Sequence, residues 1–166
     1  MQFQKSHLDP QLRPLRRLTA DDMSDLEAAR ALIQDSFSYM ETRVDPPSSV
    51  RELTLDAVLG QTQRGEIWCL GAPVVACVFL TPRADCLYLG KLAVAAASRG
   101  MGASRILVEH ACDRARQLGY AVLELQVRIE LVENQAAFAR LGFVQTAETS
   151  HPGFLRPTSL TLQRRV

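Results

Sequence analysis

Two glycines and an arginine between an apolar run and a helical pattern carry the clearest chemistry in this sequence. The run Leu87–Val94 predicts a buried strand, and a helical pattern begins shortly after it. Between the two stand Arg99, Gly100 and Gly102. The first turn of a helix presents unpaired N–H groups and about half a positive charge, and glycine lets that backbone approach an anion closely. The pattern therefore predicts a pyrophosphate site, although the glycines would equally serve a tight turn from strand to helix.

The loop lacks the features of two common nucleotide-binding motifs. A dinucleotide fingerprint needs a third glycine where this sequence has Arg105, and a Walker A loop needs a Gly-Lys-Ser/Thr run that does not follow. An enzyme acting on nucleotide phosphates is therefore disfavoured. What remains is an Arg-Gly-x-Gly-Ala loop preceded by Leu92-Ala-Val.

Two motifs together resemble one enzyme family. The run Leu92-Ala-Val-x-x-x-x-Arg-Gly-x-Gly-Ala is similar to the signature strand and loop of the GNAT N-acetyltransferases. The run Glu133-Asn-Gln-Ala-Ala-Phe-Ala-Arg-Leu-Gly-Phe143 resembles the family's E-N-x-x-x-Y-x-x-L-G-F element. The resemblance covers about Arg13 to Gln163. It implies an α/β protein of the mixed α+β kind, with a mostly antiparallel sheet of about seven strands splayed into a V and four helices.

The resemblance implies acetyl-CoA as the co-substrate. The expected reaction transfers its acetyl group to a primary amine of a small molecule, peptide or protein by direct attack on the thioester. The implied cofactor contacts are a strand end, the loop around the pyrophosphate and one asparagine at the thioester end: Leu92, Ala93, Val94, Arg99, Gly100, Met101, Gly102, Ala103, Ser104 and Asn134.

Acetyl transfer needs a neutral amine, so proton-transfer groups matter. Deprotonating a lysine-like amine of pKa near 10.4 costs about 4.6 kcal/mol at pH 7, and a base must assist. By the resemblance, the family's strand glutamate falls near Tyr88 here, and its usual tyrosine, which protonates the leaving thiolate, is Phe138. The candidate catalytic residues are Tyr88, Glu124 and Asn134, and Asp85 is a further candidate base.

Two features of the site stay open at this stage. The expected donor to the reaction's oxyanion is a backbone N–H between Leu92 and Val94. The missing base and Phe138 also favour a second hypothesis, a catalytically weak or inactive module that binds acetyl-CoA as a sensor or regulatory partner.

The acceptor is expected near the end of the first helix and the proline-rich loop after it. The candidate residues are Phe37, Tyr39, Met40 and Arg43, which combine apolar and aromatic surface with one charge. This lining is compatible with acyl-chain, amino-acid or peptide acceptors. His151, in a late loop, is a further candidate near the acceptor.

The elements that position these residues follow from periodicity and turn signals. A first helix is expected from a capping box at Thr19 to Phe37, and a second from a capping box at Ser49 and Glu52 to about Gly60. Further helices are expected over 103–118 and 134–141, stopped by Gly119 and Gly142. Strands are expected at 15–18, 67–70, 74–80, 87–94, 122–127, 143–146 and 158–163.

Composition limits the protein class. The 166 residues are 47% hydrophobic and carry a net charge of +1, which gives no support for bulk nucleic-acid binding. We expect one domain over 13–166 after a flexible terminus at 1–12. The apolar runs are too short to span a membrane, and no secretion signal is visible. Four cysteines without a C-x-x-C pair and three scattered histidines predict buried free thiols, no metal site and a cytoplasmic protein. A homodimer stays open.

Overall fold

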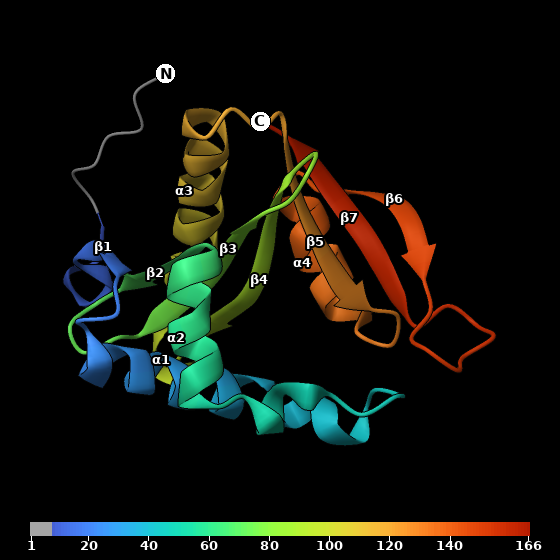
Figure 1. Cartoon of the computed structure of the whole chain (residues 1–166), viewed down its shortest axis with the longest axis horizontal. Helices are drawn as coiled ribbons and strands as arrows, with labels where there is room; N and C mark the ends of the chain where they lie inside the picture. Colours follow the sequence, from blue (N-terminus) through green and yellow to red (C-terminus); the bar gives the residue numbers. More distant parts are fainter. Residues whose placement is uncertain (1–7) are drawn as a thin grey trace.

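The computed structural model describes residues 8–166, which form one sheet with helices on both faces (Figure 1). The strands within these residues are β1 (Leu15–Leu18), β2 (Glu66–Leu70), β3 (Ala76–Pro82), β4 (Leu87–Val94), β5 (Val122–Arg128), β6 (Val144–Thr149) and β7 (Ser159–Arg165). They lie in the order β1-β2-β3-β4-β5-β7-β6, and every neighbouring pair is antiparallel except β4–β5. The predicted mixed, mostly antiparallel sheet is confirmed.

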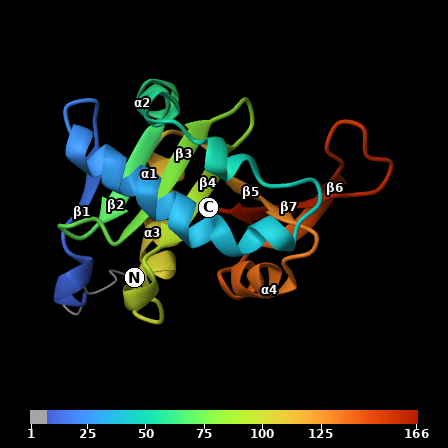
Figure 2. The ribbon, with the colours of Figure 1, turned by 90° about the horizontal axis from the view of Figure 1, so that it is seen from below.

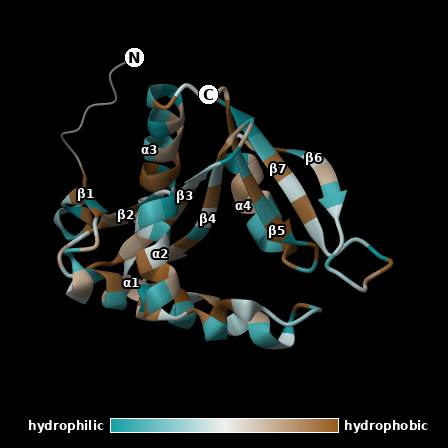
Figure 3. Ribbon diagram, in the orientation of Figure 1, coloured by the Kyte–Doolittle hydropathy of each residue, from teal (hydrophilic) through white to brown (hydrophobic). Residues whose placement is uncertain are grey.

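Helices cover the two faces of this sheet (Figure 2). The α-helices of the described chain are α1 (Met23–Phe37), α2 (Leu55–Arg64), α3 (Ala103–Gln117) and α4 (Val132–Arg140). Buried residues of α1 and α2 share one core cluster, and those of α3 pack with β5 and β7 in another, which α4 joins through Phe138. Each helix carries both hydrophobic and hydrophilic residues, as expected for a helix with one buried side (Figure 3). No helix among the described residues has the length and apolarity to cross a bilayer.

The start of the second helix was wrongly predicted. Ser49–Glu52 forms only a short 3₁₀ turn, η4, and the chain is extended at its C-cap, Leu53. The helix begins at Leu55, where the Thr54 hydroxyl accepts a hydrogen bond from the Ala57 amide at 3.1 Å. It ends at Arg64, with Gly65 as its C-cap, four residues beyond the predicted end. Both Ser49 and Thr54 could cap a helix here. The helix begins after Thr54, because the residues that follow it include the side of the helix that is buried.

The first helix also begins later than predicted. The backbone N–H of Thr19 donates to Asp22 Oδ2 at 2.7 Å, so the two residues of the expected capping box do interact. They close a turn ahead of the helix, which starts at Met23. At the N-terminus, Leu12 lies in a short 3₁₀ turn (η2, Pro10–Leu12) and is buried. Most of the flexible segment expected at 1–12 lies outside the described residues.

Strands β4 and β5 pair only near their N-terminal ends. The pairs are Leu87 with Leu123 and Tyr88 with Glu124, after which the strands diverge (Figure 1). The predicted V in the sheet is therefore present, and it opens directly after Tyr88. All four cysteines are free and buried, as the sequence predicted.

A bulge in β4 lies beside this opening. Gly90 pairs with Phe79 and Ala93 with Cys77, so β4 has one residue more than β3 between these pairs. Lys91 stands in the bulge with a φ of +52°, and no other non-glycine residue in the described chain has a positive φ. Such a backbone costs of order 1 kcal/mol or more and persists only where surrounding structure holds it.

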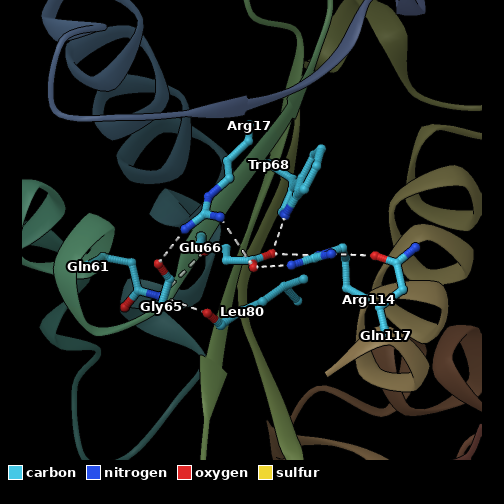
Figure 4. Close-up of polar contacts among 8 residues, drawn as sticks. All are labelled: Arg17, Gln61, Gly65, Glu66, Trp68, Leu80, Arg114 and Gln117. Atoms are coloured by element: carbon cyan, nitrogen blue, oxygen red, sulfur yellow. Dashed lines mark hydrogen bonds and ion pairs between the residues drawn. The ribbon is translucent and has the colours of Figure 1, made fainter. Parts of the chain in front are cut away.

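An ion-pair network centred on the buried Glu66 connects β2 to α3 and β1 (Figure 4). Glu66 accepts hydrogen bonds from Arg114 Nε at 2.9 Å and from Trp68 Nε1 at 2.7 Å, and Arg17 lies 3.5 Å away. Burial alone would raise the pKa of Glu66, but the hydrogen bonds from Arg114 and Trp68 and the guanidinium charges outweigh it and lower that pKa. Glu66 therefore stays ionised and holds α3 against the sheet.

Candidate functional site

A cleft of about 750 Å³ lies where β4 and β5 diverge. Its walls come from the end of α1, the segment 38–50 after it, β4, β5 and α4. The predicted site residues that line it are Phe37, Tyr39, Met40, Arg43, Tyr88, Leu92, Ala93, Val94, Arg99, Ser104 and Asn134. Residues far apart in the sequence are thus brought to one cavity.

The glycine loop stands at the start of α3, at one end of this cleft. Gly100 and Gly102 have φ values of +79° and +84°, and a Cβ on either would meet no atom within 4 Å. The first intrahelical bond runs from the Ile106 amide to the Gly102 carbonyl at 3.0 Å, so the amides before Ile106 have no partner inside the helix. Both glycines therefore leave open space in front of unpaired amides, which fits a pyrophosphate.

The remaining loop residues differ in their relation to the cleft. Arg99 is exposed and lines it together with Ser104, whereas Gly100, Met101, Gly102 and Ala103 are not part of its lining. Ala103 is buried and packs in the core below the loop. The loop therefore presents backbone groups and Arg99 at the mouth of the cleft, rather than inside it.

One edge of β4 faces the cleft. Ala93 and Val94 pair with β3 on their other side, and β5 has already diverged at this level. The Val94 carbonyl accepts a hydrogen bond from the Ser36 hydroxyl at 3.3 Å, which ties α1 to this wall. The open edge can hydrogen-bond an extended, amide-bearing chain such as the pantetheine arm of acetyl-CoA.

Tyr88 lies at the closed end of the cleft. Its ring packs beside Gly90, where a Cβ would be 3.4 Å away, and the Arg83 guanidinium carbon lies 3.6 Å from the ring centroid. The pKa of Tyr88 is raised, because the effect of burial outweighs the Arg83 charge and the hydrogen bond with the Gln126 backbone, which both lower it. The phenol therefore stays protonated at neutral pH, so it can donate a proton but cannot serve as the base.

The two candidate carboxylate bases lie outside the cleft lining. Glu124 accepts a hydrogen bond from Gln163 Nε2 at 2.7 Å and another from Arg83 at 3.4 Å, so both its oxygens are engaged. Asp85 is exposed in the turn between β3 and β4. The strand position of Glu124 was read correctly, but its side chain points to β7 and the β3–β4 turn instead of the cavity.

Polar contacts join the predicted acceptor segment to the start of α4. The Tyr39 hydroxyl accepts a hydrogen bond from Asn134 Nδ2 at 2.9 Å, and Arg43 forms an ion pair with Glu133, with one N–O distance of 3.0 Å. The pKa of Glu133 is lowered to about 2, mainly by the hydrogen bond from Arg43 and further by a hydrogen bond from its own backbone. Glu133 is therefore ionised and occupied, and Asn134 is oriented by Tyr39. These contacts were not predictable from the sequence.

Two further side chains in the cleft wall bear on proton transfer. Phe138 lies at the position expected for a tyrosine, and its ring packs edge-to-face on Phe143 with centroids 5.8 Å apart. It offers no hydroxyl. His151 also lines the cleft, and its Nδ1 shares a hydrogen bond with the buried Thr158 hydroxyl. Within residues 8–166 there is no group of three or more His, Cys, Asp or Glu side chains placed to hold a metal ion.

Comparisons with known proteins agree on a family and a fold. The sequence profile described as Acetyltransferase (GNAT) family matches residues 26–143. No curated protein sequence matches the chain. Among solved structures, PaiA N-acetyltransferase from Thermoplasma acidophilum in complex with coenzyme A is 14% identical, with a TM-score of 0.71 over 92% of this chain and 98% of that one. Ribosomal-protein-S18-alanine N-acetyltransferase from Escherichia coli is 19% identical, with a TM-score of 0.65 over 92% of each chain. Ard1 from Thermoplasma volcanium is 17% identical, with a TM-score of 0.69 over 92% and 97%.

Proposed function

This chain belongs to the Acetyltransferase (GNAT) family, in which acetyl transfer from acetyl-CoA is general, and from that premise we propose that it acetylates a primary amine of a small molecule or peptide. The observation that carries the proposal is the open glycine loop at the start of α3, placed at the mouth of a cleft between two diverging strands. An anion site and a channel for an extended chain thus adjoin each other.

The residues divide the binding of acetyl-CoA between them. The unpaired amides at the start of α3 and the Arg99 guanidinium would hold the phosphates. The open edge of β4 from Leu92 to Val94 would hydrogen-bond the arm and supply a backbone N–H to the developing oxyanion. When bound, acetyl-CoA supplies an acyl group activated as a thioester.

Proton transfer at the acceptor falls to His151 in this account. An acceptor amine of pKa near 10.4 costs about 4.6 kcal/mol to deprotonate at pH 7, and the described cleft lining offers no free carboxylate because Glu133 is held by Arg43. When the Thr158 hydroxyl donates to the Thr149 carbonyl, it accepts the Nδ1 proton of His151. The Nε2 atom is then an acceptor that can take the proton of the ammonium, directly or through water.

A second function, an acetyl-CoA sensor with weak or no turnover, has one observation in its favour. The wall position of the usual tyrosine is Phe138, so the leaving thiolate meets no hydroxyl there. A CoA thiolate leaves without protonation more slowly but does leave, since free thiols have a pKa of about 8.5. Phe138 therefore lowers the expected rate and does not abolish the reaction.

Two measurements test the proposal. Calorimetry with acetyl-CoA and with ATP should show micromolar binding of acetyl-CoA and no comparable binding of ATP. Thiol release from acetyl-CoA is then followed over a broad panel of amines. Acetyl-CoA binding with amine-dependent thiol release supports the enzyme, binding without release for any amine supports the sensor, and preferential ATP binding contradicts both.

A further inference from the structure

Lys91 lines the cleft, and the proposed acetyl transfer assigns it no role. The sequence contains only two lysines, and Lys91 is the one within the described residues. It stands in the β4 bulge with a φ of +52°, and it is one of the residues that line the cleft. The strained backbone therefore holds the described chain's one lysine at the cavity wall.

The Lys91 ammonium has no counter-charge. Burial alone acts on it and lowers its pKa, and no neighbouring charge, whether carboxylate or guanidinium, adds to or opposes that effect. A cation removed from water is costly unless an anion or a set of acceptors compensates for it. The half-buried Lys91 is thus a cation placed in the cavity without a partner from the described chain.

Each of the other cations in the cleft lining has a carboxylate near it or stands at the phosphate loop. Arg43 is paired with Glu133. Arg128 donates to the Pro46 carbonyl; burial lowers its pKa, the nearby Glu130 and Asp45 carboxylates oppose this only in part, and its buried Nε has no partner among the described residues. Arg99 stands at the phosphate loop. Among the described lining residues away from that loop, Lys91 is therefore the cation with no carboxylate near it, and no free carboxylate faces the cavity.

The position of Lys91 along β4 separates it from the phosphate end. It comes three residues after Tyr88, the last β4 residue paired with β5, so it lies near the closed end of the opening. The segment from Leu92 to Val94 stands between Lys91 and the loop. An arm that runs along this segment from the loop ends beside Lys91, so Lys91 lies at the reacting end and not among the phosphates.

We infer that Lys91 binds a carboxylate of the acceptor, so that the preferred substrate is a small zwitterionic amine such as an amino acid. This inference rests on the proposed acetyl transfer. A cation with no carboxylate near it, in a wall that includes the apolar and aromatic side chains of Phe37 and Met40, matches one carboxylate on an apolar molecule. A polyamine or a lysine-rich peptide would meet this cation and find no free carboxylate.

The test compares acceptors that differ only in the carboxylate. L-phenylalanine and L-methionine are compared with L-phenylalaninamide and L-methioninamide by thiol release from acetyl-CoA. The measured quantity is the selectivity ratio, kcat/KM for the acid over kcat/KM for its amide. Because this ratio is compared between proteins, the lower amine pKa of the amides cancels.

Three variants give the expected pattern. Lys91→Met should lower the selectivity ratio tenfold to hundredfold, the range of a lost charge-assisted hydrogen bond. Lys91→Arg, which keeps the charge, should retain most of the preference. Arg116→Met removes an exposed charge from α3 outside the cleft and should leave the ratio at the wild-type value. A loss of kcat that is equal for acids and amides would make Lys91 a proton acceptor and overturn the inference.

A binding measurement keeps this inference separate from the acetyl transfer it rests on. Calorimetry of the protein saturated with CoA, titrated with N-acetyl-L-phenylalanine and with N-acetyl-L-phenylalaninamide, requires no turnover. A lower acid-over-amide affinity ratio in Lys91→Met supports the carboxylate site even where no amine is acetylated. Equal ratios in wild type and Lys91→Met overturn it even where thiol release is fast, as does acetylation of spermidine in preference to both amino acids.

Discussion

Replacing Gly102 by alanine tests the anion site at the residue that shapes it. Gly102 has a φ of +84°, and a Cβ there would meet no atom within 4 Å. The substitution therefore creates no clash and costs only the left-handed backbone, about 1–2 kcal/mol. Alanine also restricts the unfolded chain more than glycine does, which offsets about 0.4–1 kcal/mol of this loss of stability. We expect a net loss of about 1 kcal/mol, which lowers Tm by about 2–4 °C in a chain of this size.

Gly119 provides the matched control at the opposite end of α3. Its φ is also +84°, and a Cβ there would likewise meet no atom within 4 Å. Gly119→Ala should therefore lose the same stability as Gly102→Ala. Only the methyl group at position 102 would stand among the amides expected to contact the phosphates. Losing one charge-assisted hydrogen bond there costs about 1.5–3 kcal/mol, so we expect the Kd for acetyl-CoA to rise at least about tenfold.

Calorimetry measures the two affinities, and thermal unfolding followed by circular dichroism measures the two stabilities. A phosphate site at Gly102 requires that the two variants lose equal stability and that Gly102→Ala loses more affinity for acetyl-CoA than Gly119→Ala does. If the Gly102 and Gly119 variants bound acetyl-CoA equally well, the phosphates would not contact the start of α3, and the assignment of this loop would be refuted.

Four other changes test separate parts of the account. Phe138→Tyr restores a hydroxyl at the cleft wall and should raise kcat by about tenfold to hundredfold in the thiol-release assay; no gain with any active acceptor would show that the thiolate needs no acid there. His151→Gln should lower kcat in the thiol-release assay for every active acceptor, and an unchanged kcat would exclude His151 as the base. Arg114→Ala leaves Glu66 buried without its main partner, so the free energy of unfolding measured in urea should fall by about 3–5 kcal/mol. Arg116→Ala breaks an exposed pair and should lower it by less than about 1 kcal/mol. Similar losses in the two variants would contradict the role given to the ion-pair network. Because the folded pKa of Glu66 lies below its unfolded value of about 4.3, its stabilisation is complete above that pH and is lost as the pH falls through the folded pKa. Glu66→Gln should therefore flatten the acid side of the stability–pH curve, and a curve as steep as that of the wild type would exclude this linkage.

The sequence predicted the parts of the site that depend on local signals. The order of strands and helices, the turn at Gly100 and Gly102, and the stops at Gly119 and Gly142 all follow from periodicity and from positions that require a positive φ. Phe37 was placed correctly at the cleft because the chain must leave α1 near the site.

The rest of the site depends on pairing and packing that no local signal encodes. The bulge at Lys91 exists only in the register of β4 against β3, so no local pattern singles out this lysine. The direction of the Glu124 side chain is set by Arg83 and Gln163, which lie 41 and 39 residues away. Similarly, the bond between Tyr39 and Asn134 joins residues 95 positions apart. Contacts of this kind arise from the tertiary fold, and reading residue types along the chain cannot supply them.

The most direct measurement of the central claim is an NMR titration of the isotope-labelled protein with acetyl-CoA. We expect saturable shifts in the backbone amides of Gly102, Ala103 and Ser104 and along Leu92–Val94, with the Gly119 amide unmoved. Saturable shifts confined to other parts of the chain, with these amides unchanged, would contradict that claim.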